Sequence, residues 1–156
     1  CVVFMNKVGA TQCLLAEGVS AACGANGTNP LHVAAFINVD QEIVQVLVSG
    51  RCSLQDRIRP VFGSVLWVIY FGFCVSYRLG RRDACSSMFF HMLGSTPLLL
   101  AAASGHMSIA FALLRCRADL EDCNDRGFSV AKVAETTGLY SASSTRRLLR
   151  AHMRTS

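Results

Sequence analysis

The sequence has little of what catalytic or metal-binding sites require. It contains no glycine-rich phosphate-binding loop, no HExxH motif and no GxSxG motif. No two of its eight cysteines have the spacing of two intervening residues that zinc sites and thioredoxin-type redox sites use. Its four histidines are scattered along the chain. We therefore expect no catalytic residue, no metal site and no cofactor, and we expect this chain not to be an enzyme.

Charge is also scarce. Charged residues make up 16% of the 156 residues, and the net charge is +5. The basic residues are concentrated in three separate stretches, 51–59, 78–82 and 146–154, which do not form the single basic surface that binds nucleic acid. We expect no nucleic-acid partner, and we interpret these stretches as solvated faces.

Several cysteines lie among apolar residues, as Cys13 and Cys74 do. There a thiol acts as a small hydrophobic side chain, so we interpret the cysteines as reduced and expect a cytoplasmic or nuclear protein. The sequence begins with Cys1 and not with methionine, from which we expect a fragment or a processed piece of a longer chain.

What the sequence does contain is one phrase that recurs. Residues 94–106 are GSTPLLLAAASGH, residues 27–35 are GTNPLHVAA, and residues 127–138 are a weaker copy, GFSVAKVAETTG. The first two copies place a helix-capping residue before a proline that the first helical position tolerates. Gly94 and Gly127 are 33 residues apart, and Gly27 and Gly94 are 67 apart, one more than twice 33. Helices this short are marginal alone in water, so we expect the units to stack.

This period and this TPLH-like phrase resemble the ankyrin repeat. The residues that carry the resemblance are Asn29, Pro30, Leu31, His32, Ala34, Ala35, Thr96, Pro97, Leu98, Ala101, Ala102 and Gly105. The resemblance implies an all-α solenoid of helix-turn-helix units joined by β-hairpin-like loops, used to bind another protein. It also implies that His32 bonds the backbone of a neighbouring hairpin, which is a structural role.

We expect one ankyrin-repeat domain over residues 1–156. Its predicted parts are a truncated repeat at 1–26, a repeat at 27–59, a degenerate repeat or hydrophobic insert at 60–93, a repeat at 94–126 and a C-terminal capping repeat at 127–156. In the capping repeat, residues 146–154 are predicted to form a basic amphipathic helix.

The segment 61–77 has no charged residue over its 17 positions and allows three interpretations. As a membrane-spanning helix it would reach about 26 Å, short of a hydrocarbon core of ~30 Å. As a degenerate repeat it would form helices over 65–71 and 75–82, with Gly72 ending the first. As a foreign segment, such as a gene model produces by translating an intron, it would fold poorly. We favour a helical, repeat-sized insert packed into the stack, and the alternative is a membrane-associated protein with a transmembrane or membrane-embedded segment at 61–77.

Two sets of residues are candidates for contact with a partner protein, whose identity the sequence does not specify. Phe36 and Ile37 stand where family members face the concave groove, and exposed apolar side chains there suggest a binding surface. Asn124, Asp125 and Arg126 belong to the polar tip of a predicted hairpin loop, and we expect Asp125 and Arg126 to be exposed there.

Overall fold

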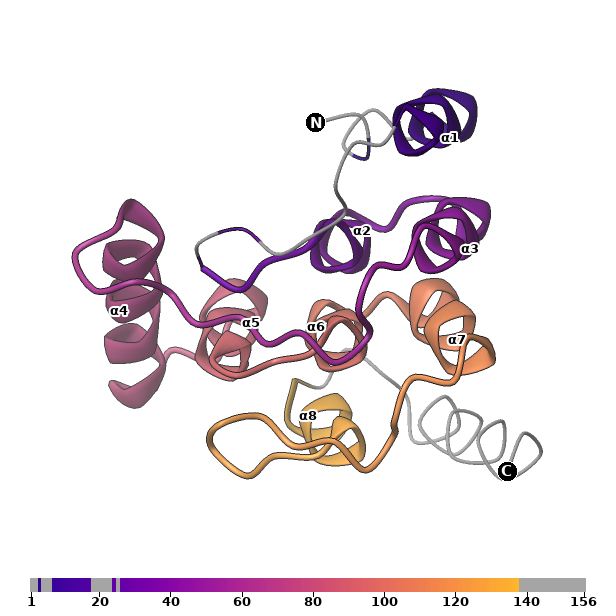
Figure 1. Cartoon of the computed structure of the whole chain (residues 1–156). Coiled ribbons are helices and arrows are strands. Elements are labelled where there is room, and N and C mark those ends of the chain that lie inside the picture. The colour runs from indigo at the N-terminus through magenta and orange to yellow at the C-terminus, as the bar shows by residue number, and fades with distance from the viewer. Residues whose placement is uncertain (1–2, 4–6, 18–23, 25, 138–156) are drawn as a thin grey trace.

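The computed structural model describes residues 3, 7–17, 24 and 26–137, and the chain folds there into short helices. These are α1 (Val8–Ala16), α2 (Pro30–Ile37), α3 (Gln41–Ser49), α4 (Val65–Arg78), α5 (Ala84–Met92), α6 (Pro97–Ser104), α7 (Met107–Arg115) and α8 (Val130–Thr137). Figure 1 shows them in two columns, α1, α3 and α7 in one and α2, α6 and α8 in the other, with α4 and α5 extending sideways from α6.

The two strong copies of the repeated phrase form equivalent helices. In α2 the Asn29 side chain accepts a hydrogen bond from the backbone N–H of His32, and in α6 Thr96 accepts one from Leu99. Each helix begins with its proline, whose missing N–H costs nothing at that position. α2 ends at a left-handed Asn38 and α6 at a left-handed Gly105. The predicted all-α repeat solenoid is confirmed.

The two units stack directly on each other. α2 packs on α6 and α3 packs on α7, although 60–93 separates the units in the sequence. The His106 ring joins them, with its Nδ1 2.7 Å from the carbonyl oxygen of Ala35. Residues 60–93 therefore do not form a degenerate repeat between the two units. They form a helical insert, as predicted, but it packs beside the stack and not between its units.

Residues 59–93 instead replace the two-residue tip of a hairpin loop. Three loops share one hydrogen-bond register, in which one residue donates to and accepts from the opposite arm. In the first loop, Gly24 N donates to Thr28 O (2.7 Å) and Gly27 N donates to Gly24 O (2.9 Å). In the second, Ile58 N donates to Ser95 O (3.1 Å) and Gly94 N donates to Ile58 O (2.8 Å). In the third, Asn124 N donates to Phe128 O (3.0 Å) and Gly127 N donates to Asn124 O (2.9 Å). Two residues lie within the first and third tips, whereas 35 lie between Ile58 and Gly94.

The insert adds 33 residues to the loop, which equals the length of one repeat. Counting the period along the chain therefore leaves a space that looks like a missing repeat. The spacing of Gly27 and Gly94 cannot distinguish a repeat in the stack from a loop of the same length.

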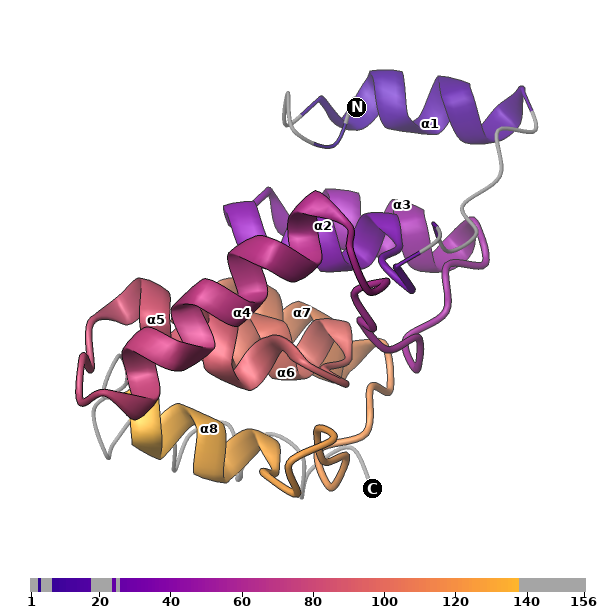
Figure 2. The same cartoon turned by 90° about the vertical axis from the view of Figure 1, so that its left-hand side faces the viewer.

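The insert forms a pair of helices, α4 and α5, beside the stack. α4 packs on α5, and α5 packs on α6 and α8 (Figure 2). α4 runs without interruption through Gly72, so the predicted break at Gly72 between helices at 65–71 and 75–82 is wrong. Among the residues that the structure describes, no helix, α4 included, is both long enough and apolar enough to cross a membrane.

Replacing Gly72 with alanine should stabilise the folded chain by about 1 kcal/mol. Glycine in a helix interior costs about that much relative to alanine. An added Cβ at Gly72 would meet no atom within 4 Å, so nothing opposes the gain. Chemical denaturation of the variant checks this, and an unchanged or lower midpoint would contradict it.

The ends of the described stack are α1, which packs on α3, and α8, which packs on α6. α8 follows Ser129, whose hydroxyl accepts a hydrogen bond from Lys132 N at 3.5 Å, as expected for a helix cap. The predicted basic helix at 146–154 lies outside the described residues.

Candidate functional site

The concave side of the stack differs between its two complete units. Leu100 and Ala103 of α6 are buried, with 3% and 0% of their surface exposed, because α5 lies beside α6. The corresponding positions of α2 are Val33, which is half-buried, and Phe36, which is 44% exposed. The insert therefore covers one unit of the concave face and leaves the other open.

An apolar pocket lies at the step between the covered and the open unit. Its volume is about 170 Å³, and its surface is wholly apolar. It is lined by Thr28, His32, Val33, Phe36, Ile58, Phe89, Met92 and Leu100. α2, α6 and α5 each contribute residues, so the repeat helices and the insert build the pocket together.

Of the predicted concave-face residues, the structure places Phe36 in the pocket lining and leaves Ile37 outside it. Ile37 is half-buried and packs against the core. Phe89 and Met92 were not among the candidates, because their position depends on how the insert returns to the stack. The run of Leu98, Leu99 and Leu100 is the sequence signal that could have predicted a covering helix. Three consecutive leucines point to different sides of a helix, and an isolated unit would leave one of them exposed.

The predicted hairpin-tip residues are engaged within the chain. Asn124 is only 4% exposed, and its side chain donates to the carbonyl oxygen of His91 at 3.1 Å. Its Oδ1 accepts from the backbone N–H groups of Arg126 and Phe128, which closes the tip. The returning insert thus covers the hairpin at Asn124.

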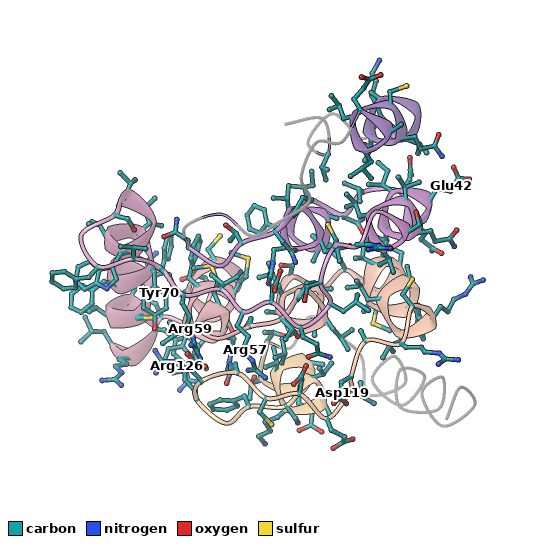
Figure 3. The ribbon with its side chains drawn as sticks, in the orientation of Figure 1. Glu42, Arg57, Arg59, Tyr70, Asp119 and Arg126 are labelled. Atoms are coloured by element: carbon teal, nitrogen blue, oxygen red, sulfur yellow. The ribbon has the colours of Figure 1, made fainter. Side chains whose placement is uncertain are left out.

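Arg126 joins the hairpin to both helices of the insert. Its Nε donates to the carbonyl oxygen of Phe90 at 3.0 Å, and its guanidinium carbon lies 4.0 Å from the centre of the Phe90 ring. Its Nη2 donates to the hydroxyl of Tyr70 at 2.8 Å and lies 3.6 Å from Sγ of Cys74 (Figure 3). Burial raises the pKa of the Tyr70 phenol, so this hydroxyl stays neutral. Arg126 is half-buried, so the expectation that it is exposed is wrong.

Asp125 is the exposed residue of the predicted tip, and it lies against the first residues of the insert. Its carboxylate is 3.6 Å from Nε of Arg59, and its backbone N–H donates to Leu93 O at 3.2 Å. Arg57 makes a parallel connection, donating to Gly94 O at 3.1 Å and to the carboxylate of Asp122 at 2.9 Å. Both ends of the insert are thus tied to the hairpin that follows α7.

Two buried histidines support the site. His32 Nε2 lies 3.2 Å from Ser95 O, which is the hairpin contact that the family resemblance implies. His91 sits among the rings of Tyr77, Phe90 and Phe128, with Nε2 3.3 Å from the Thr136 hydroxyl. Burial lowers the pKa of each from 6.5 to about 4, and the charge of Arg126 adds to the effect at His91.

The folded chain should lose stability between pH 6.5 and pH 4. Over this range the unfolded chain binds protons at these histidines that the folded chain does not, so the free energy of unfolding falls as the pH falls. Each histidine contributes at most about 1.4 kcal/mol per pH unit. Urea denaturation at several pH values checks this. The same pH dependence in a His32→Gln, His91→Gln double variant would contradict it.

The comparisons with known proteins match this geometry. The family model described as Ankyrin repeat matches residues 26–57 and 93–125. The two matches contain α2 with α3 and α6 with α7, and the insert lies between them. No curated protein matches the chain. Among the residues that the structure describes, no cluster of histidine, cysteine or acidic side chains could hold a metal ion.

Proposed function

The chain is an ankyrin-repeat protein, and we propose that it acts by binding a partner protein through the apolar pocket on its concave face. Ankyrin repeats are protein-interaction modules. The observation that carries the proposal is the wholly apolar pocket that α2, α6 and the insert line, with Phe36 exposed at its edge.

The size and lining of the pocket suit one bulky apolar side chain. Cavities of roughly 150 Å³ with apolar walls stay dry and accept a benzene-sized group. The pocket has a volume of about 170 Å³, so a phenylalanine, leucine or isoleucine of the partner would fill it. Such buried anchors carry most of the binding energy of protein interfaces, while the surrounding contacts exclude water.

The hairpin tips support binding less well than the concave face does. The tip at Asp125 and Arg126 holds the insert, and the tip before it has been replaced by the insert. We therefore place the partner on the concave face and assign Asn124 and Arg126 to holding the insert in position.

The test is a selection of short random peptides on the wild-type chain, followed by affinity measurements on variants. Peptides with a bulky apolar residue should lose about tenfold or more in affinity for Phe36→Glu, which puts a charge at the pocket edge. The matched control is Leu14→Glu in α1, where the replaced side chain is 40% exposed, compared with 44% for Phe36. If every selected peptide binds Phe36→Glu as tightly as wild type, the pocket is not the binding site.

The division of residues 1–156 into repeats is part of this proposal. The packing of α1 on α3 supports a truncated repeat at 1–26, and the packing of α8 on α6 supports a capping repeat at 127–156. The cytoplasmic or nuclear location stays a prediction from the cysteine pattern.

A further inference from the structure

The walls of the pocket come from two parts of the chain. Phe89 and Met92 of α5 form the wall on the side of the insert, and the other lining residues belong to the two repeat units. The ring of Phe89 stacks on that of Phe73 in α4 at a ring-centre distance of 4.6 Å, so both helices of the insert hold this wall. The pocket is therefore complete only while α5 lies against α6, an arrangement that we call the docked state.

The hairpin at 124–126 fixes the helical turn of α5 that carries this wall. Phe90 and His91 lie between the two wall residues in the sequence. The carbonyl oxygen of Phe90 accepts a hydrogen bond from Nε of Arg126 at 3.0 Å, and that of His91 accepts one from the side-chain amide of Asn124 at 3.1 Å. The contacts that hold the insert and the contacts that line the pocket thus meet on one helical turn.

The surface that α5 buries against the stack is not fully compensated. Ser87 is 3% exposed and His91 is 1% exposed. Within the described chain, Oγ of Ser87 and Nδ1 of His91 have no hydrogen-bond partner. A buried polar atom without a partner costs free energy, and opening of the insert would return both atoms to water. Docking is therefore weaker than its apolar contacts alone would make it.

The stack does not need the insert for its own contacts. α2 packs on α6 and α3 packs on α7, and the ring of His106 joins the two units at Ala35. Both ends of the insert leave the stack at one hairpin, between Ile58 and Gly94. α4 and α5 can therefore move away together while the repeat units stay folded, as units of low local stability do.

We propose that docking of the insert regulates the pocket, so that an apolar group bound there stabilises α5 on α6. This inference rests on the proposed function of the pocket. A bound group touches Phe89 and Met92 only in the docked state, so docking strengthens binding and binding strengthens docking by the same factor. Arg126 is then a positioning residue for the pocket, although it does not line it.

The opposite coupling would follow if a partner used the concave face of α6. Leu100 and Ala103 are buried under α5, and a partner that covered them would have to displace the insert. The pocket favours the first arrangement. Its volume of about 170 Å³ lies between α2, α6 and α5, and removal of α5 would leave an open surface in place of a pocket.

The experiment measures amide hydrogen exchange of the whole chain with and without a peptide from the pocket selection. In the unliganded chain, amides of α5 should exchange faster than those of α3, because the insert opens alone. With the peptide at 100 times its Kd, exchange of α5 should slow about 100-fold. α1 provides the control, since it packs on α3 and contributes no residue to the pocket, and its exchange should not change.

Variants of Arg126 test the same coupling from the other side. The Kd of the peptide should rise in proportion to 1 + K, where K is the ratio of open to docked chain that exchange of α5 gives for each variant. Arg126→Lys should lie between wild type and Arg126→Ala in both measurements. Lys132→Ala removes an exposed ion pair with Glu135 and should match wild type in both.

Three results would overturn the proposal. Unchanged exchange of α5 with a bound peptide that depends on Phe36 would leave the pocket as the binding site but remove its coupling to the insert. Faster exchange of α5 on binding would show that the partner displaces the insert from α6. Equal exchange of α3 and α5 in the unliganded chain would show that the insert does not open alone.

Failure of the pocket as a protein-binding site gives a different result. In that case no selected peptide loses affinity for Phe36→Glu, and benzene replaces the peptide as the probe, because apolar cavities of this size accept it. Slower exchange of α5 in benzene, with α1 unchanged, would support the coupling without a partner protein. Unchanged exchange of α5 in benzene would overturn it.

Discussion

Replacing Gly94 with alanine should destabilise the chain by about 2–5 kcal/mol. Gly94 has a φ of +70°, a left-handed conformation that costs other residues roughly 1–2 kcal/mol. An added Cβ would also overlap the carboxylate of Asp125 and lie 2.6 Å from its backbone nitrogen. Because the backbone cannot move aside as a flexible side chain can, overpacking adds roughly 1–3 kcal/mol. Chemical denaturation measures the loss.

Gly127 provides the matched control. It occupies the same place in the next hairpin and has a φ of +76°, but an added Cβ would meet no atom within 4 Å. Gly127→Ala should therefore lose only the conformational part, roughly 1–2 kcal/mol. Equal losses for the two variants would show that the contact between Gly94 and Asp125 is unimportant. A larger loss of stability for Gly94→Ala than for Gly127→Ala would show that the chain returns from the insert to the hairpin through this close contact.

The repeat helices could be predicted from the sequence because their signals are local. The pairs Asn29–Pro30 and Thr96–Pro97 combine a side-chain cap with a proline at the first helical position, and both act within one helical turn. Gly105 ends α6 through its own left-handed conformation. Such interactions do not depend on what the rest of the chain does, so the family and the fold class followed from them.

The position of the insert could not be predicted because it depends on pairing across the chain. Ile58 and Gly94 form the same hydrogen bond as Asn124 and Gly127, but residues 59–93 separate them. The extra length equals one repeat, so spacing alone favours a repeat in the stack. The hydrogen-bond register distinguishes the two arrangements, and only the folded chain contains it.

The expected exposure of Arg126 was wrong for the same reason. Asp125 and Arg126 have the composition of an exposed turn, and in an isolated repeat they would face water. The insert passes over this turn, so Arg126 meets Tyr70, which lies 56 residues earlier in the chain. Phe36 was a better candidate because α2 is the unit that the insert leaves open.

Removing the Arg126 side chain should release the insert from the hairpin. Arg126→Ala eliminates two hydrogen bonds from a charged donor, to Phe90 O and to the Tyr70 hydroxyl, and the contact of the guanidinium with the Phe90 ring. Hydrogen bonds to charged groups contribute about 1.5–3 kcal/mol each, less when partly exposed, and cation–π contacts about 0.5–2 kcal/mol. We expect a local loss of about 2–4 kcal/mol, since α4 and α5 keep their apolar contacts with each other.

The loss should be confined to the insert and its neighbours. Amide hydrogen exchange of α4 and α5 should accelerate in Arg126→Ala, while exchange in α2 and α3 stays near its wild-type rate, because those helices pack on α6 and α7 independently of Arg126. Trp67 reports opening of α4 by fluorescence. Arg126→Lys should restore only part of the protection, since lysine lacks the planar fork that reaches both acceptors. Lys132→Ala removes an exposed ion pair with Glu135 and should change nothing measurable. Uniform acceleration over all helices in Arg126→Ala would instead show that the insert and the stack unfold as one unit.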